Sequence, residues 1–355
     1  MNELLNRYGW SPEWAARFAD YLSTPEAAEV DGPAAGRVIR HDGAGLMVAL
    51  PDGPVRAMFG PPVQPAPVVG DWVVLDRANT PVATLPRDSL LRRRAAGTGE
   101  KEQAMAANVD LVLVVCGLDR PVRTGRIQRT ITIALDAGAE SLVVLTKADK
   151  VGPEVAAEAE LIAQEVDPNL EVVTLSAKGG WGIDDLLERV GARTVALIGE
   201  SGAGKSTLVN ALMAGEVAAE GDVREGDSKG RHTTTHRELH LLDSGGILVD
   251  TPGIREVGIW TDTEAVAESF PEIEELSEQC RFRDCAHQSE PGCAVRAAVK
   301  DGRLSAERLE AWRALDAEAA SAELRADLVE YRRRNRQWGR IGREAQKAKE
   351  DLRNL

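Results

Sequence analysis

A phosphate-binding motif in the middle of the chain constrains the fold more than any other feature. Residues 199–206 read Gly-Glu-Ser-Gly-Ala-Gly-Lys-Ser and fit the pattern G-x-x-x-x-G-K-[ST], and the apolar run 194–198 before them has the composition of a buried strand. In this pattern the glycines let backbone N–H groups face a phosphate, Lys205 reaches the β- and γ-phosphates, and Ser206 places a hydroxyl on Mg²⁺. The residues expected to contact the nucleotide here are Gly199, Glu200, Ser201, Gly202, Ala203, Gly204, Lys205, Ser206 and Thr207.

Strands and helices are predicted to alternate around this loop. Short runs rich in Val, Leu and Ile suit strands buried on both faces, and helical stretches separate them. The predicted strands are 110–118, 141–145, 170–175, 194–198, 237–242 and 247–250, and the predicted helices are 125–136, 153–165, 183–190 and 205–213. This alternation predicts a doubly wound α/β domain.

The remaining segments differ from this domain in their residue patterns. Residues 4–22 predict a short helix whose main turn opens at Ser11-Pro12, and 36–94 contains short β-type runs between Gly and Pro clusters, which predicts a small all-β barrel of OB-type size. After Trp260 the composition is helical. We therefore expect a multidomain chain with four parts: an N-terminal helical extension (1–30), an OB-type β-barrel (31–98), an α/β nucleotide-binding domain (99–262) and a helical C-terminal domain (263–355).

Two strand-end segments favour guanine as the base. A carboxylate at Asp149 can accept from the N1–H and the 2-amino group of guanine, a donor pair that adenine lacks at those positions. Lys147 would lay its aliphatic stem over the base, and Thr146 stands where the usual signature has Asn. The next predicted strand ends in Ser176, Ala177 and Lys178, where a backbone N–H can reach guanine O6. Phosphate loop and base-recognition segments together predict a GTP site.

Residues near the γ-phosphate are predicted from two further segments. Asp250 ends a predicted strand in Asp-Thr-Pro-Gly and can hold Mg²⁺ through water, while the N–H of Gly253 can sense the γ-phosphate. In the polar loop 229–236 Thr234 is the favoured additional Mg²⁺ ligand. Where many GTPases have a Gln that orients water this chain has Ile254, so His232, or with less support His236, is expected to act there.

The order of these segments is permuted. In ordinary small GTPases the phosphate loop comes first, whereas here both base-recognition segments precede it. With this order, the sequence Gly-Arg-His-Thr-Thr-Thr at 230–235 and the cysteine cluster, the chain resembles the ribosome small-subunit-dependent GTPase A (RsgA) family from about residue 36 onward. The resemblance implies a circularly permuted GTPase with an OB-fold barrel and a zinc-binding C-terminal domain. It also implies a role in late maturation of the 30S subunit, with hydrolysis stimulated by the subunit and followed by release.

A cysteine cluster near the start of the C-terminal part predicts a metal site. Three of the four cysteines lie within fourteen residues. Three thiolates and one imidazole form a complete tetrahedral set for a structural Zn²⁺, with free thiols as the alternative. The predicted ligands are Cys280, Cys285, His287 and Cys293.

The net charge and the composition limit which partners the chain can bind. A formal net charge of -14 argues against indiscriminate coating of nucleic acid, so contact with 16S rRNA would need local basic patches. The two candidates are residues 92–94, all Arg, and the tail 331–349, which has eight basic residues and one acid and is equally compatible with a solvated helix face. No apolar run has membrane-spanning length and no secretory signal is visible, so we expect a cytoplasmic monomer without membrane contact.

Two alternative functions stay open on the sequence. An ATP-dependent kinase or ATPase would use the same phosphate loop but leaves Asp149 and residues 176–178 unexplained. A module that binds GTP without turning it over gains some support from Ile254.

Overall fold

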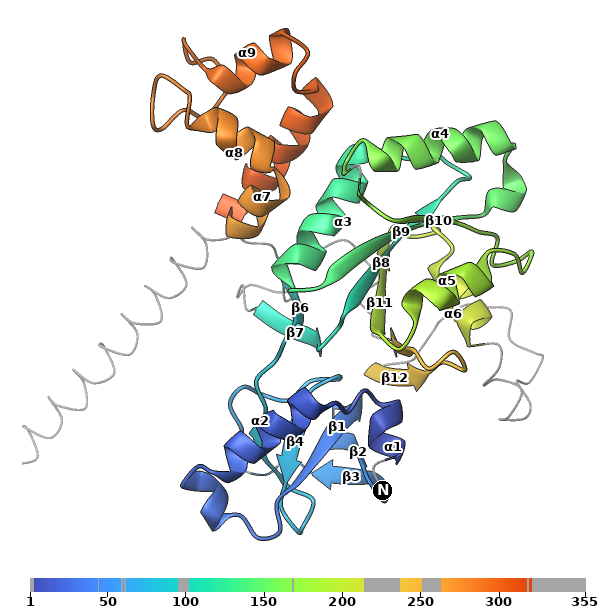
Figure 1. Cartoon of the computed structure of the whole chain (residues 1–355), viewed down its shortest axis with the longest axis vertical. Helices are drawn as coiled ribbons and strands as arrows, with labels where there is room; N and C mark the ends of the chain where they lie inside the picture. The colour runs from blue at the N-terminus through green and yellow to red at the C-terminus, as the bar shows by residue number, and fades with distance from the viewer. Residues whose placement is uncertain are drawn as a thin grey trace, which may run out of the picture. The chain divides into compact units, whose positions relative to one another are not determined.

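The computed structural model describes residues 3–43, 45–58, 60, 62–94, 102–167, 169–213, 237–250, 263–317 and 319–320 (Figure 1). By its contacts the chain divides into two compact units, one made of Met1–Arg93 and Ala104–Ile259, the other of Arg94–Gln103 and Trp260–Leu355. Among the described residues, no helix combines the length and the apolar character needed to cross a membrane.

A mixed sheet at the centre of the first unit carries the phosphate loop. Its strands lie in the order β10-β9-β8-β11-β13-β12; neighbours pair in parallel except β12, which is antiparallel to β13. The strands are β8 (Leu111–Gly117), β9 (Glu140–Thr146), β10 (Val172–Thr174), β11 (Thr194–Gly199), β12 (Arg237–Leu241) and β13 (Ile247–Asp250). All six strands predicted from the sequence are therefore present, in an order that brings the phosphate loop after β11 next to the strand ends of β8 and β9.

Helices cover both faces of this sheet. Alternate residues of β8 point to opposite faces: Val112 and Val114 pack with α3 and α4, whereas Leu113 and Val115 pack with α5 and α6. The helices are α3 (Thr124–Asp136), α4 (Pro153–Gln164), α5 (Ile183–Val190) and α6 (Lys205–Leu212), within one residue of the predicted bounds. Burial on both faces explains why β8, β9 and β11 read as nearly unbroken apolar runs.

The N-terminal strands form an antiparallel sheet in the order β3-β2-β1-β4-β5. They are β1 (Ala34–His41), β2 (Gly45–Leu50), β3 (Gly53–Met58), β4 (Trp72–Leu75) and β5 (Pro81–Thr84). This order suits an OB-type barrel, which would be closed by contact of β3 with β5 and stays a prediction. β1 also pairs with β12 at Arg40↔Glu238 and His41↔Arg237, which continues the sheet into the nucleotide-binding part.

The N-terminal extension is two helices instead of the single predicted one. α1 (Glu3–Arg7) and α2 (Pro12–Leu22) are separated at Gly9, whose φ is 83°. Ser11 caps α2 by accepting from the N–H of Trp14 at 3.4 Å. A short 3-10 turn (Glu26–Glu29) follows. Leu5 and Trp14 pack with Trp72 in one apolar cluster, so the extension covers one face of the N-terminal sheet.

A two-stranded sheet, which the sequence did not predict, contains the arginine run 92–94. β6 (Leu90–Arg94) pairs with β7 (Glu102–Ala107). Arg92 Nη2 lies 2.7 Å from Asp136 Oδ2 at the end of α3, so this arginine is engaged within the protein.

From Thr263 onward the described part of the second unit consists of helices and the loops between them. It contains α7 (Thr263–Ser269), α8 (Pro271–Ser277), α9 (Ala294–Lys300) and a further helical stretch over 306–317. Its core is small, with Phe270, Ile273 and Val295 among the most deeply buried side chains, and the cysteine cluster packs against it. The predicted basic tail 331–349 lies outside the described residues.

Candidate functional site

The phosphate loop connects β11 to α6, and its glycines are required by close packing. A Cβ on Gly199 would lie 2.3 Å from the carbonyl oxygen of Val115. Gly204 has a φ of 92°, and a Cβ there would lie 3.2 Å from Thr146 Oγ1. The loop therefore runs tightly against β8 and β9, which only glycine at these positions allows.

Lys205 is buried at the first position of α6, with 7% of its surface exposed. Its Nζ donates to the carbonyl oxygens of Gly199 and Glu200, at 2.6 Å each. These bonds hold the ammonium across the loop, where phosphate oxygens can replace the carbonyls as acceptors. Ser206 and Thr207 follow in the exposed first turn of α6, where helix N–H groups are available to an anion.

Thr146 joins the base-recognition segment to the phosphate loop. It ends β9, is 1% exposed, and its hydroxyl lies 2.5 Å from the carbonyl oxygen of Ala203 and 3.3 Å from that of Cys116. The departure from the usual Asn is thus accommodated, because a hydroxyl supplies the donor that fixes the two loops to each other.

Lys147 also contacts the phosphate loop. Its backbone is left-handed, with a φ of 62°, and its Nζ donates to the carbonyl oxygen of Gly202 and, at 2.7 Å, to Asp119 Oδ2. The hydrogen bond from Lys147 holds the pKa of Asp119 below its usual range. The stem of Lys147 therefore crosses from β9 to the phosphate loop, as a side chain that covers a base must.

Asp149 is exposed and oriented by a neighbour from the next strand. Ser176 Oγ donates to Asp149 Oδ1 at 2.6 Å and accepts from the N–H of Gly179 at 2.9 Å. The bond from Ser176 lowers the pKa of Asp149, so the carboxylate is ionised at neutral pH. Ala177 and Lys178 lie in the turn after Ser176. The structure thus brings together the two segments predicted to recognise guanine.

The γ-phosphate side of the site is described only at Asp250, the last residue of β13. His232, Thr234 and Gly253 lie outside the described residues, as do the loop 229–236 and Ile254. Their roles in catalysis and Mg²⁺ binding stay predictions.

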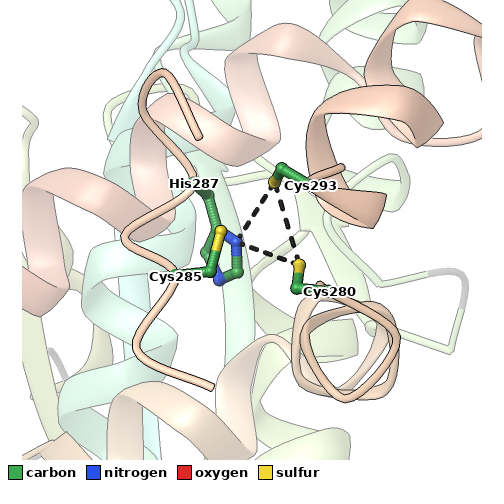
Figure 2. A group of neighbouring side chains, drawn as sticks. All are labelled: Cys280, Cys285, His287 and Cys293. Carbon is green, nitrogen blue, oxygen red and sulfur yellow. Dashed lines mark hydrogen bonds between the residues drawn. The ribbon is translucent and has the colours of Figure 1, made fainter. Parts of the chain in front are cut away.

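The second unit gathers the four predicted metal ligands at one point (Figure 2). Their ligand atoms all lie within 4.8 Å of one another. His287 Nδ1 is 3.6 Å from Cys280 Sγ and 3.4 Å from Cys293 Sγ, and the two sulfurs are 3.8 Å apart. A tetrahedral Zn²⁺ with ordinary bond lengths requires about 3.8 Å between two sulfurs and about 3.6 Å between sulfur and nitrogen. The geometry therefore fits zinc.

The pKa shifts of His287 and Cys280 suit a metal as well, whereas burial raises the pKa of Cys285 to about 11. Burial lowers the pKa of His287, which keeps the imidazole neutral. Burial raises the pKa of Cys280, but the backbone N–H groups of Val295 and Ala294 outweigh it and the net pKa is lowered. Such N–H donors stabilise a thiolate ligand.

The chain is similar to known proteins in both sequence and fold. A family model described as RsgA GTPase matches residues 84–260. A small ribosomal subunit biogenesis GTPase RsgA of Streptomyces coelicolor is 44% identical, over 97% of this chain and 95% of the relative. This chain belongs to the RsgA GTPase family. A Streptomyces avermitilis RsgA of the same description is 42% identical over 97% of this chain and 93% of the relative. The crystal structure of YjeQ from Thermotoga maritima is 25% identical, with a TM-score of 0.60, and covers 81% of this chain and 99% of its own.

Membership of the RsgA GTPase family makes the chain a GTP-hydrolysing enzyme. Sequence reasoning missed Asp119 and Arg120, which follow β8 and reach Lys147 and the phosphate loop. Their position in the sequence could have identified them, because they directly follow the predicted strand 110–118. Ligand-binding residues of parallel sheets gather at the carboxyl ends of the strands.

Proposed function

We propose that the chain binds the small (30S) ribosomal subunit and its 16S rRNA, and hydrolyses GTP during late 30S assembly. The subunit stimulates hydrolysis, and hydrolysis leads to release. The names of the curated relatives support the ribosomal assignment. In this proposal the protein acts as a cytoplasmic monomer.

The observation that carries the nucleotide assignment is the connection of the base-recognition segments to the phosphate loop. Thr146 and Lys147 bind loop carbonyls, and Ser176 orients Asp149. Such a frame would hold a purine and its phosphates at a fixed separation. The carboxylate of Asp149 would then favour guanine over adenine. An ATP-dependent function gives Asp149 no role.

Each residue around the phosphates then has a task. Lys205 binds the β- and γ-phosphates, and the N–H groups of residues 199–207 surround them. Ser206, Thr234 and Asp250 would hold Mg²⁺, which would supply positive charge against the charge that develops on the phosphates. His232 orients the attacking water.

The permuted order gives a route from nucleotide to partner. Residues 251–262 follow Asp250 directly and lead to Thr263 at the start of α7. A change at the γ-phosphate therefore acts on the segment that enters the helical unit. One structural Zn²⁺ on Cys280, Cys285, His287 and Cys293 holds that unit in shape, because its core is small.

GTP turnover by the purified protein, alone and with 30S or 50S subunits and with ATP as control nucleotide, tests the proposal. Stimulation by 30S and GTP alone is the expected result. Equal slow GTP turnover in every mixture would remove the ribosomal assignment but leave the enzyme. Tight GTP binding with no turnover in any mixture would favour the non-hydrolysing module.

A further inference from the structure

A positively lined hollow lies beside the phosphate loop at the start of α3. Its volume is about 370 Å³, and its walls are Arg120, Pro121, Arg123, Arg126, Glu200 and Ser201. Three arginines against one glutamate in the wall concentrate positive charge in a chain whose formal net charge is -14, although Asp119 Oδ1 lies 3.7 Å from Arg120 Nε beside the hollow. Such a concentration raises the local affinity for anions against the repulsion of the whole molecule.

The arginines are held at the phosphate loop while much of their surface stays open. Arg126 Nη1 lies 2.7 Å from Glu200 Oε2, and Arg120 Nη1 lies 3.8 Å from the same oxygen. Arg120 also donates to the carbonyl oxygen of Ser201 at 3.4 Å. The side chains of Arg120 and Arg126 are nevertheless 42% and 45% exposed, and Arg123 is exposed.

The charges at the N-terminus of α3 destabilise the helix. Arg123 is its N-cap residue without a side-chain capping bond, and the first turn contains no acidic residue. Cations at the positive end of a helix dipole are unfavourable, and a bound anion offsets this cost.

We propose that this hollow binds a phosphate of an RNA backbone. Binding there alters the phosphate loop through Glu200. The inference rests on the proposed function, since the RNA belongs to the ribosomal subunit. Three guanidinium groups suit phosphate, which accepts their paired N–H donors. Five residues of the hollow also line an adjoining, mainly apolar pocket that includes Val114 and Val115. The three exposed guanidinium groups, and not the polarity of the whole wall, are what favour an RNA phosphate as the occupant.

The coupling follows from competition for Arg126. A phosphate in the hollow draws the guanidinium from Glu200 and weakens the connection between α3 and the phosphate loop. Glu200 is the second residue of that loop, so its release alters the loop that holds the GTP phosphates. Contact with RNA thereby changes GTP turnover.

The test compares Arg123→Ala and Arg126→Ala with a matched control, Arg189→Ala, whose partly exposed arginine lies on α5 at the opposite face of the sheet. The full chain is titrated with 30S subunits and with a short fluorescein-labelled RNA duplex at several KCl concentrations. GTP turnover is measured with and without 30S.

Arg123→Ala is expected to keep the turnover measured without 30S and to bind RNA on the order of tenfold more weakly, with the slope of log K against log [KCl] reduced by about 1. Arg126→Ala is expected to show the same loss and also a smaller ratio of stimulated to unstimulated turnover, because its connection to Glu200 is already broken.

The inference would be overturned if Arg123→Ala and Arg126→Ala matched Arg189→Ala in the salt dependence of RNA binding and in the stimulation of GTP turnover by 30S. The proposed function would still stand in that case, provided that 30S stimulates the wild-type protein. Absence of 30S binding by wild type would instead contradict the proposed function, and the RNA duplex would still test the hollow. Binding of polyglutamate, but not of RNA, that depends on Arg123 would assign the hollow to an acidic protein and overturn the inference.

Discussion

At the scale of single residues, the specificity of the nucleotide site depends on which hydrogen-bonding group faces the base. Asp149 offers acceptors only, and the hydrogen bond from Ser176 lowers its pKa below the usual value, so the carboxylate is ionised at neutral pH. Because this pKa is depressed in the folded protein, the associated stabilisation is present at neutral pH and is lost only as the pH falls below about 4.

Asp149→Asn is expected to exchange guanine for xanthine. The amide N–H₂ meets the 2-amino group of guanine donor to donor, but can donate to the 2-carbonyl of xanthine. GTP affinity should fall on the order of 10- to 1000-fold while XTP affinity rises. Competition against a fluorescent GTP analogue measures both. Asp184→Asn, in the first turn of α5, serves as control, and equal loss of both nucleotides would contradict the assigned role.

The thiol of Cys116 is expected to react slowly with alkylating reagents. It is partly buried at the end of β8, and burial raises its pKa from 9.0 to about 11. At pH 8 the reactive thiolate is therefore scarce, and iodoacetamide should alkylate Cys116 at least tenfold more slowly in the folded protein than in urea. Since the folded pKa is the higher one, stability falls as the pH rises from 9 to 11. Peptide mapping by mass spectrometry gives the rate; fast labelling at pH 8 in the native state would disprove the burial effect.

At the scale of secondary-structure elements, local sequence was most informative where burial is one-sided. In α5 the buried Ile183, Leu186 and Val190 follow helical spacing, and the predicted bounds are those observed. The N-terminal helix prediction was less accurate, because the left-handed Gly9 and the cap at Ser11 divide it.

The helices α7 to α9 are expected to depend on the metal. Cys293 is 6% exposed and accepts from the N–H of Arg296 at 3.4 Å, so Cys293→Ser removes a buried ligand. Structural zinc contributes about 10–16 kcal/mol to folding of small domains, more than this small core can replace. Loss of one equivalent of zinc and rapid proteolysis of the second unit are expected, with GTP binding retained.

Metal analysis and limited proteolysis measure these effects. Cys116→Ser is the matched control and should keep its zinc. A Cys293→Ser protein that retains a full equivalent would show that the other three groups suffice.

At the scale of the whole first unit, one buried arginine joins segments that are distant in sequence. Arg37 on β1 is 3% exposed and donates to the carbonyl oxygens of Tyr8, Gly70 and Asn108 and to Thr194 Oγ1. Burial lowers its pKa to about 10, so the guanidinium is still charged at neutral pH. It connects the N-terminal helices, the N-terminal sheet and the nucleotide-binding sheet.

Arg37→Met is expected to reduce the free energy of unfolding by about 3–5 kcal/mol, because it leaves several buried acceptors without donors. Arg17→Ala is the matched control: Arg17 bonds to Asp88 and to the carbonyl oxygen of Pro86 but is partly exposed, so less than about 1 kcal/mol is expected. Urea denaturation followed by tryptophan fluorescence compares the two. Equal midpoints would show that Arg37 is dispensable.

The sequence by itself determined the class of the nucleotide site, the permuted order of its segments, the alternation of strands and helices, and which four residues form the cysteine cluster. These depend on local spacing and periodicity, which a single chain displays directly. Tertiary structure decided the contact of Thr146 with Ala203, the pairing of Lys147 with Asp119, the position of Arg126 at Glu200 and the role of Arg37. Thr146 and Ala203 are 57 residues apart, and Arg37 and Thr194 are 157 apart. Such contacts arise from the order in which strands meet in a sheet, a property that local propensity and hydrophobic pattern do not encode.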